Sequence, residues 1–182
     1  MGLEAGIVKV YTIGHSTRSL EAFLALLQTH GVELLVDVRS FPRSRRNPQF
    51  NLETLGPELA KAGIGYLHFR ELGGMRRPRP DSANTAWQVD GFRGYADHMA
   101  TPEFAAGLAG LLEAAAGRQT AVMCAEAVPW ECHRQLLADA LVARSVPVEH
   151  ILGEGRREAH QLSPYARITG VEVTYPGIMS AL

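Results

Sequence analysis

The chain has 182 residues, of which 46% are hydrophobic and 20% charged, and its formal net charge at pH 7 is -1. This length suits one domain with a real hydrophobic core. No run of about 18 apolar residues occurs and the segment up to Lys9 is too short and polar for a signal peptide, so we expect no membrane association. Two cysteines are too few for a disulfide framework, which favours a cytoplasmic globular protein.

Strands and helices are expected to alternate along the chain. Short runs of β-branched or continuously apolar residues predict strands at 8–13, 33–38, 65–69, 120–124 and 148–152. Helical spacing of apolar residues, with capping signals, predicts helices between Ser19 and Gly31 and at 52–62, 92–99, 101–116 and 132–144. This order predicts a three-layer α/β fold with a mostly parallel sheet of about five strands and helices on both faces.

The chain divides into an α/β domain, residues 1–152, and a C-terminal extension of the same domain, residues 153–182. The extension is polar, and residues 171–174 could add an edge strand. Residues 71–91 form a long segment without periodicity, and a loop of that length in a compact domain is usually functional or mobile.

Arginines cluster in two expected loops, and such clusters often bind phosphate because one guanidinium pairs with two oxygens. One cluster contains Arg39, Arg43, Arg45 and Arg46, and the other contains Arg70, Arg76, Arg77 and Arg79. A GC-rich genome also explains a high arginine content. The clusters therefore suggest an anionic ligand without identifying it.

Polar residues follow the first predicted strand, and ligands of parallel sheets bind beyond the carboxyl ends of strands. Gly14, His15 and Ser16 lead towards a helix whose free amide groups could bind an anion. The glycine spacing fits neither a Walker A loop nor a dinucleotide fingerprint. The alternative is that Ser16 caps the helix and His15 packs in the core.

Asp37 and Arg39 lie at the end of the second strand. A carboxylate inside an apolar strand is costly unless it is paired, and Arg39 points to the same side of an extended chain. The pair could simply hold the loop. Alternatively, Asp37 acts as a base or ligand, while Arg39, with Arg43 further along the loop, binds a phosphate or carboxylate.

The segment from Cys124 to Arg134 carries the most specific pattern: Cys124 ends a strand, Glu126 follows, and Cys132-His133-Arg134 opens a helix. Three interpretations stay open. One cysteine could be a nucleophile, with Glu126 or a histidine managing protons and a helix N-terminus lowering the thiol pKa. The cysteines and His133 could bind zinc or iron. Both cysteines could equally be buried packing residues.

A glycine pair, Gly73-Gly74, follows the third strand and allows an unusual turn or close approach of a ligand. Trp87, Phe92 and Tyr95 come next and could stack on a ring or pack in the core.

Together these motifs resemble the family called domain of unknown function 488. The resemblance is carried, in order, by Ile13-Gly14-His15-Ser16, Asp37-Val38-Arg39-Ser40-Phe41-Pro42, Leu72-Gly73-Gly74, Gly94-Tyr95 and Cys124-Ala125-Glu126 with Cys132-His133-Arg134. It extends from Val10 to about Leu152. The resemblance implies that the strand ends form one site and supplies no reaction.

The leading hypothesis is an enzyme, a hydrolase or transferase, acting on a phosphate-bearing substrate such as a nucleotide or nucleic acid. Glu126, Cys124, Asp37, His15 and His133 are the expected catalytic residues. Gly14, Ser16, Arg39, Arg43, Arg134, Gly73 and Gly74 are expected to bind the substrate. The alternatives are a non-enzymatic nucleic-acid-binding module that uses the arginine loops, and a metal or redox sensor built on the cysteines and His133. Metal, cofactor and oligomeric state stay open.

Overall fold

The computed structural model describes residues 8–178, and the predicted domain limits at residues 1–7 and 179–182 lie outside them. Its main sheet has six strands in the order β3-β2-β4-β1-β5-β6. The strands are β1 (Val10–Gly14), β2 (Leu34–Asp37), β3 (Gly65–His68), β4 (Thr120–Cys124), β5 (Val148–Gly153) and β6 (Arg156–Ala159). The first five are parallel, and β6 is antiparallel to β5.

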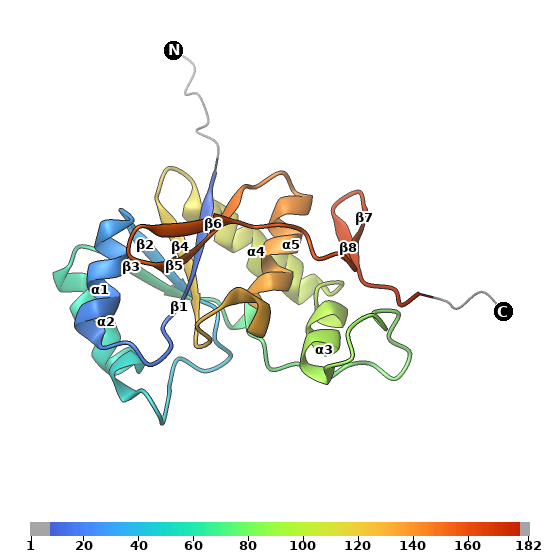
Figure 1. Cartoon of the computed structure of the whole chain (residues 1–182), viewed down its shortest axis with the longest axis horizontal. Helices are drawn as coiled ribbons and strands as arrows, with labels where there is room; N and C mark the ends of the chain where they lie inside the picture. Colours follow the sequence, from blue (N-terminus) through green and yellow to red (C-terminus); the bar gives the residue numbers. More distant parts are fainter. Residues whose placement is uncertain (1–7, 179–182) are drawn as a thin grey trace, which may run out of the picture.

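Helices cover both faces of the sheet (Figure 1). Successive strand residues point to opposite faces, and apolar side chains of the strands pack in a core on each face. The helices are α1 (Leu20–Thr29), α2 (Leu52–Lys61), α3 (Asp90–His98), α4 (Pro102–Ala115) and α5 (Arg134–Ala143). Tyr11 and Ile13 of β1 pack in one core with α1 and α2, whereas Val10 packs in the other core with α3, α4 and α5. The predicted three-layer α/β architecture is confirmed.

The C-terminal extension differs from the prediction. Its edge strand in the main sheet is β6, whereas residues 171–174 contribute to a separate hairpin of β7 (Arg167–Thr169) and β8 (Glu172–Thr174). Gly170 has a positive φ of 66° in the turn between them, a conformation that glycine adopts without steric cost. Within residues 8–178 no helix combines the length and apolarity needed to cross a bilayer.

Three neighbouring strands carry the predicted site to one edge of the sheet. In β1 and β4, Gly14 pairs with Cys124, and in β2 and β4, Asp37 pairs with Met123. The polar residues that follow β1, β2 and β4 therefore lie close together, at the edge where α/β folds bind ligands.

Candidate functional site

A cavity of about 500 Å³ lies beyond the ends of β2 and β4. Its polar lining includes Arg39, Arg43, Glu126 and His133, together with the two cysteines. Asp37, His15, Gly14, Ser16 and Arg134 are absent from the lining. The structure thus separates the predicted site residues into a group that faces the cavity and a group that supports it.

The segment after β1 supports the segment after β4 and does not form the predicted anion cradle. The amide groups of His15 and Ser16 donate to the carbonyls of Cys124 and Ala125, at 3.0 and 2.9 Å. A Cβ atom at Gly14 would collide with the Glu126 carbonyl. Gly14 is therefore needed for close backbone packing, and the neighbouring amides already have partners.

Asp37 and Arg39 form a buried ion pair. The Arg39 guanidinium donates to both carboxylate oxygens of Asp37, with Nη2 to Oδ2 at 2.6 Å, and Nη2 also donates to the Phe50 carbonyl at 2.9 Å. The Tyr66 hydroxyl donates to Asp37 at 2.7 Å. Burial, with the Asp37 charge beside it, raises the pKa of Tyr66. Both carboxylate oxygens of Asp37 already accept hydrogen bonds from protein groups. Asp37 therefore orients Arg39 and does not face a ligand in the cavity.

His15 is also a supporting residue. Its ring stacks on Phe50 with 4.3 Å between ring centroids. Its Nδ1 atom lies 2.9 Å from the Ser16 carbonyl and so carries the hydrogen, which leaves Nε2 as an acceptor facing Arg39 Nη1 at 3.5 Å. Burial is the main cause that lowers the pKa of His15 to about 4. The imidazole is therefore neutral at pH 7.

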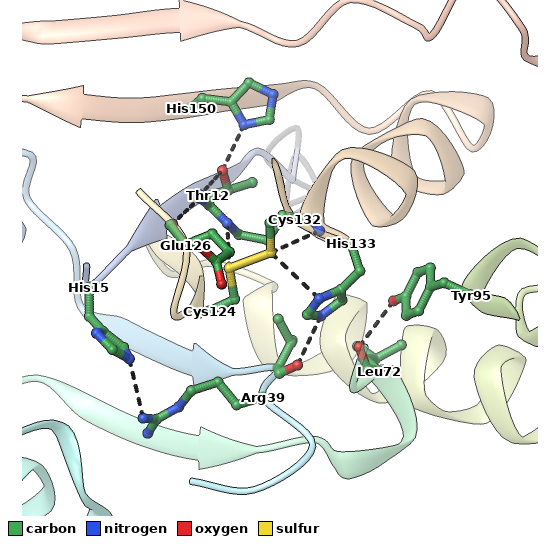
Figure 2. The surroundings of a disulfide bond; sticks show 12 residues. Thr12, His15, Arg39, Leu72, Tyr95, Cys124, Glu126, Cys132, His133 and His150 are labelled. Atoms are coloured by element: carbon green, nitrogen blue, oxygen red, sulfur yellow. Dashed lines mark hydrogen bonds between the residues drawn. A yellow bond between two sulfur atoms is a disulfide. The ribbon is translucent and has the colours of Figure 1, made fainter. Parts of the chain in front are cut away.

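Cys124 and Cys132 are paired through their Sγ atoms at the floor of the cavity. Figure 2 shows the pair between β4 and the segment that precedes α5. The sequence left these cysteines open as a nucleophile, as metal ligands or as packing residues, and did not foresee their pairing, which arises because the turn at 125–131 brings the second cysteine back over the first. Within residues 8–178 no group of three or more His, Cys, Asp and Glu side chains is arranged to hold a metal ion, so the zinc or iron interpretation lacks a ligand set there.

Arg134 lies beneath the cavity, and its side chain is fully buried. Its Nε atom donates to Cys124 Sγ at 2.9 Å, and Nη2 donates to the Glu126 carbonyl at 2.7 Å. Burial lowers the pKa of Arg134 to about 9, and the Glu126 charge offsets this only in part. The predicted contact of Arg134 with a substrate is replaced by contact with the cysteine itself.

The His133 ring lies between the Val38 carbonyl and the Cys132 sulfur. Its Nε2 atom donates to the Val38 carbonyl at 2.9 Å, which leaves Nδ1 as an acceptor 3.5 Å from Cys132 Sγ. Burial is the main cause that lowers the pKa of His133 to about 4. Helix α5 begins only at Arg134, so Cys132 precedes the first helical turn instead of lying within it. A neutral imidazole can accept a hydrogen bond from the Cys132 thiol when the pair is reduced.

The glycine pair of the third loop has a packing role. A Cβ atom at Gly73 would meet Ser40, and one at Gly74 would collide with the ring of His133. The backbone at both glycines therefore approaches other protein groups closely, and not a ligand as predicted. Gly74 also lines the cavity. Arg76, in the same loop, donates to backbone carbonyls of residues 70, 71 and 73 and is committed to holding the loop.

Several lining residues were not predicted from the sequence. Glu131 adds a second carboxylate, and Phe41, Met75 and Val89 add apolar surface. These apolar side chains are 57%, 74% and 58% exposed, which is high for residues of their kind. The sequence shows that these residues are hydrophobic and lie in predicted loops. Whether they are exposed at the cavity becomes known only from the fold.

The model of one protein family matches the chain, that of Domain of unknown function DUF488, over residues 19–141. This range is more than half of the chain. The chain belongs to the DUF488 family. The DUF488 match includes the Asp37–Arg39 pair and the whole segment from Cys124 to Arg134, whereas β1 and β5 lie outside it. No curated protein and no solved structure matched in the corresponding comparisons.

Proposed function

We propose that this chain is an enzyme that acts on a phosphate-bearing substrate, most specifically a nucleotide, with the Cys124 sulfur as its nucleophile. The observation that carries the proposal is the contact between the buried Arg134 guanidinium and Cys124 Sγ at the floor of the cavity. A histidine at the second cysteine and carboxylates at the rim provide the groups that such chemistry needs.

The charge of Arg134 favours a thiolate at Cys124. The guanidinium donates to a sulfur, a hydroxyl and a carbonyl, and none of these acceptors is a carboxylate. A buried cation without a counter-charge is costly. When the cysteine pair is reduced, ionisation of Cys124 would supply a counter-charge in direct contact with the guanidinium, so the proposal expects a thiolate there. Thiolate is the nucleophilic form of cysteine.

The lining of the cavity supports a ligand with an anionic part and a flat apolar part. Arg39 and Arg43 both line the cavity. Each pairs with one carboxylate, Asp37 and Glu53, but a guanidinium has five N–H donors and can also bind an anion. Phe41, Met75 and Phe92 offer apolar surface on which a ring could lie. A nucleotide combines both parts in one molecule, as does the end of a nucleic-acid strand.

The residues allow a balanced reaction. The Cys124 thiolate would form a bond to phosphorus while the bond from phosphorus to the leaving oxygen breaks, and the Glu126 carboxyl would give that oxygen a proton. Water would then displace the thiolate from phosphorus and give up its proton to the Glu126 carboxylate. Arg39, fixed by Asp37, would hold the phosphate oxygens during both steps.

Release of inorganic phosphate from a panel of nucleoside mono-, di- and triphosphates tests the proposal on the reduced protein. Cys124→Ser should abolish release and keep nucleotide binding. Arg43→Ala should weaken binding about tenfold, the effect of one charge-assisted contact. Arg46→Ala removes an exposed arginine of the same loop outside the cavity lining and should bind normally. Equal turnover by Cys124→Ser, or no binding of any nucleotide, would refute the proposal.

A thiol–disulfide function is the second candidate, and the pairing of the two sulfurs favours it. A dithiol such as this one is oxidised when a small disulfide accepts its two electrons and two protons and becomes two thiols. With oxidised glutathione as the probe, the reduced chain should lose both free thiols and recover them with a reductant. If the reduced pair keeps its thiols under excess oxidised glutathione, this candidate fails.

We propose the cytoplasm as the compartment, where protein disulfides are usually transient and catalytic or sensing.

A further inference from the structure

A continuous row of buried polar side chains leads away from Arg134, and none of its members lines the cavity described above. Arg134 Nη1 donates to Thr12 Oγ1 at 2.9 Å, and Thr12 Oγ1 lies 2.7 Å from His150 Nδ1. Figure 2 shows Thr12 and His150 joined by a dashed line above the cysteine pair. His150 Nε2 lies 2.8 Å from His160 Nδ1, and His160 Nε2 lies 2.7 Å from Asp139 Oδ1. The row therefore links a buried cation to a buried carboxylate through one hydroxyl and two imidazoles.

The positions of the hydrogens along this row follow from its two ends. An ionised Asp139 only accepts, so His160 carries a hydrogen on Nε2 and its Nδ1 is free to accept from His150 Nε2. Burial lowers the pKa of His150 to about 3, so this ring is neutral and its Nδ1 accepts from the Thr12 hydroxyl. The Thr12 oxygen is then free to accept from Arg134. Each link has one donor and one acceptor, and no hydrogen is left over.

The far end of the row is fixed by further contacts with Asp139. The Tyr175 hydroxyl donates to Asp139 Oδ2 at 2.7 Å, and the Ser163 amide donates to Oδ1 at 3.1 Å. Asp139 is 0% exposed, and Thr12 is 1% exposed. The C-terminal segment thus fixes the Asp139 carboxylate. Because each member of the row is hydrogen-bonded to the next, the fixed carboxylate also restrains the Arg134 guanidinium.

We propose that Thr12, His150, His160 and Asp139 are positioning residues that hold the Arg134 guanidinium against the Cys124 sulfur. The role of this row in reactivity rests on the proposed function, because it matters to catalysis only if Cys124 is the nucleophile. The row adds to that function strand β5, through His150, and the segment after β6, through His160, both of which lie outside the family match. In Arg134, Nη1 and Nη2 are each restrained by a protein acceptor, which leaves the Nε hydrogen directed at the sulfur.

The test compares two proteins, Cys132→Ser and Cys132→Ser with Thr12→Val. In each, ultraviolet absorbance against pH measures the fraction of Cys124 that is thiolate. Valine keeps the shape of threonine and removes the hydroxyl. At a pH below the midpoint, the thiolate fraction should fall about threefold to tenfold, which corresponds to the typical net effect of one hydrogen bond. Thr12→Ser restores the hydroxyl and should restore the thiolate fraction.

Thr120→Val is the matched control, because Thr120 is buried on the adjacent strand and its hydroxyl donates to the Arg118 carbonyl, outside the row. This control should titrate as the parent does. If Thr12→Val does not fold, His160→Phe replaces it; His160 borders a second cavity, and its removal leaves Asp139 with two donors. A thiolate titration unchanged by these substitutions would overturn the positioning role.

Hydrogen exchange of the Arg134 side chain separates this inference from the proposed function. Loss of the row should speed exchange of the Arg134 Nε hydrogen, whether or not Cys124 reacts with phosphate. An ordinary thiol titration in the parent, with exchange that quickens in Thr12→Val, would refute the activated nucleophile and keep the row. A lowered titration in the parent, with no change of titration or exchange in Thr12→Val, would refute the row and keep the nucleophile.

Discussion

Removal of one partner of the buried Asp37–Arg39 pair should be strongly destabilising, and Asp37→Asn measures this. The substitution keeps the shape of the side chain and removes its charge, which leaves the Arg39 guanidinium, only 6% exposed, without a counter-charge. Breaking a buried ion pair from one side typically costs about 3–5 kcal/mol. For a domain of this size that corresponds to a fall of about 6–20 °C in Tm.

Urea unfolding and thermal unfolding of the same samples give the two quantities. Glu53→Ala is the control, because it removes the partner of Arg43 in an exposed pair and should change stability far less. A loss below about 1 kcal/mol for Asp37→Asn would show that Arg39 is not held by this carboxylate. The account of Asp37 as the group that orients Arg39 would then be refuted.

Two further predictions concern packing and pH. Gly74→Ala should lower stability by about 1–3 kcal/mol in urea unfolding, because its Cβ meets the His133 ring, whereas Gly56→Ala in α2 should be neutral or stabilising; equal effects would contradict the packing role. Burial lowers the pKa of His15 from 6.5 to about 4, so between these values the unfolded chain binds a proton that the folded chain does not, and stability should fall as pH falls through this window. His15→Gln should make the fall shallower, and an unchanged slope in urea unfolding would contradict this.

The sequence predicted the layers of the fold well, because their signals are local. The apolar run before Asp37 indicates a strand covered on both faces, and Ser19 does cap α1 by accepting from the Ala22 amide at 3.1 Å. The C-terminal segment was harder. Strands β6, β7 and β8 are short and mostly exposed, so no hydrophobic pattern distinguishes the strand of the main sheet from the separate hairpin.

The site could be predicted in location but not in the division of its residues. Strand ends identified Asp37 and Cys124, and the start of a helix identified Arg134. Only the fold shows that Cys124 lines the cavity whereas Asp37 and Arg134 do not. The amides of His15 and Ser16 are taken by a crossing loop, which no local pattern reveals.

The row from Thr12 to Asp139 was not predicted at all. Its members lie on β1, on α5, on β5 and after β6. The outermost two, Thr12 and His160, are 148 residues apart along the chain. Each residue alone is typical of a buried polar group in a core. Only their spatial order, which depends on strand register and on the path of the C-terminal segment, joins them to Arg134.

The central claim is that Arg134 makes Cys124 a thiolate. The most direct measurement is the pH titration of the Cys124 thiolate in Cys132→Ser, with and without Arg134→Met, an apolar replacement of similar length for the buried cation. The account predicts a midpoint well below the ordinary cysteine pKa of about 8.5 and a return to or above that value in the Arg134→Met variant. The same ordinary midpoint in both proteins would contradict it.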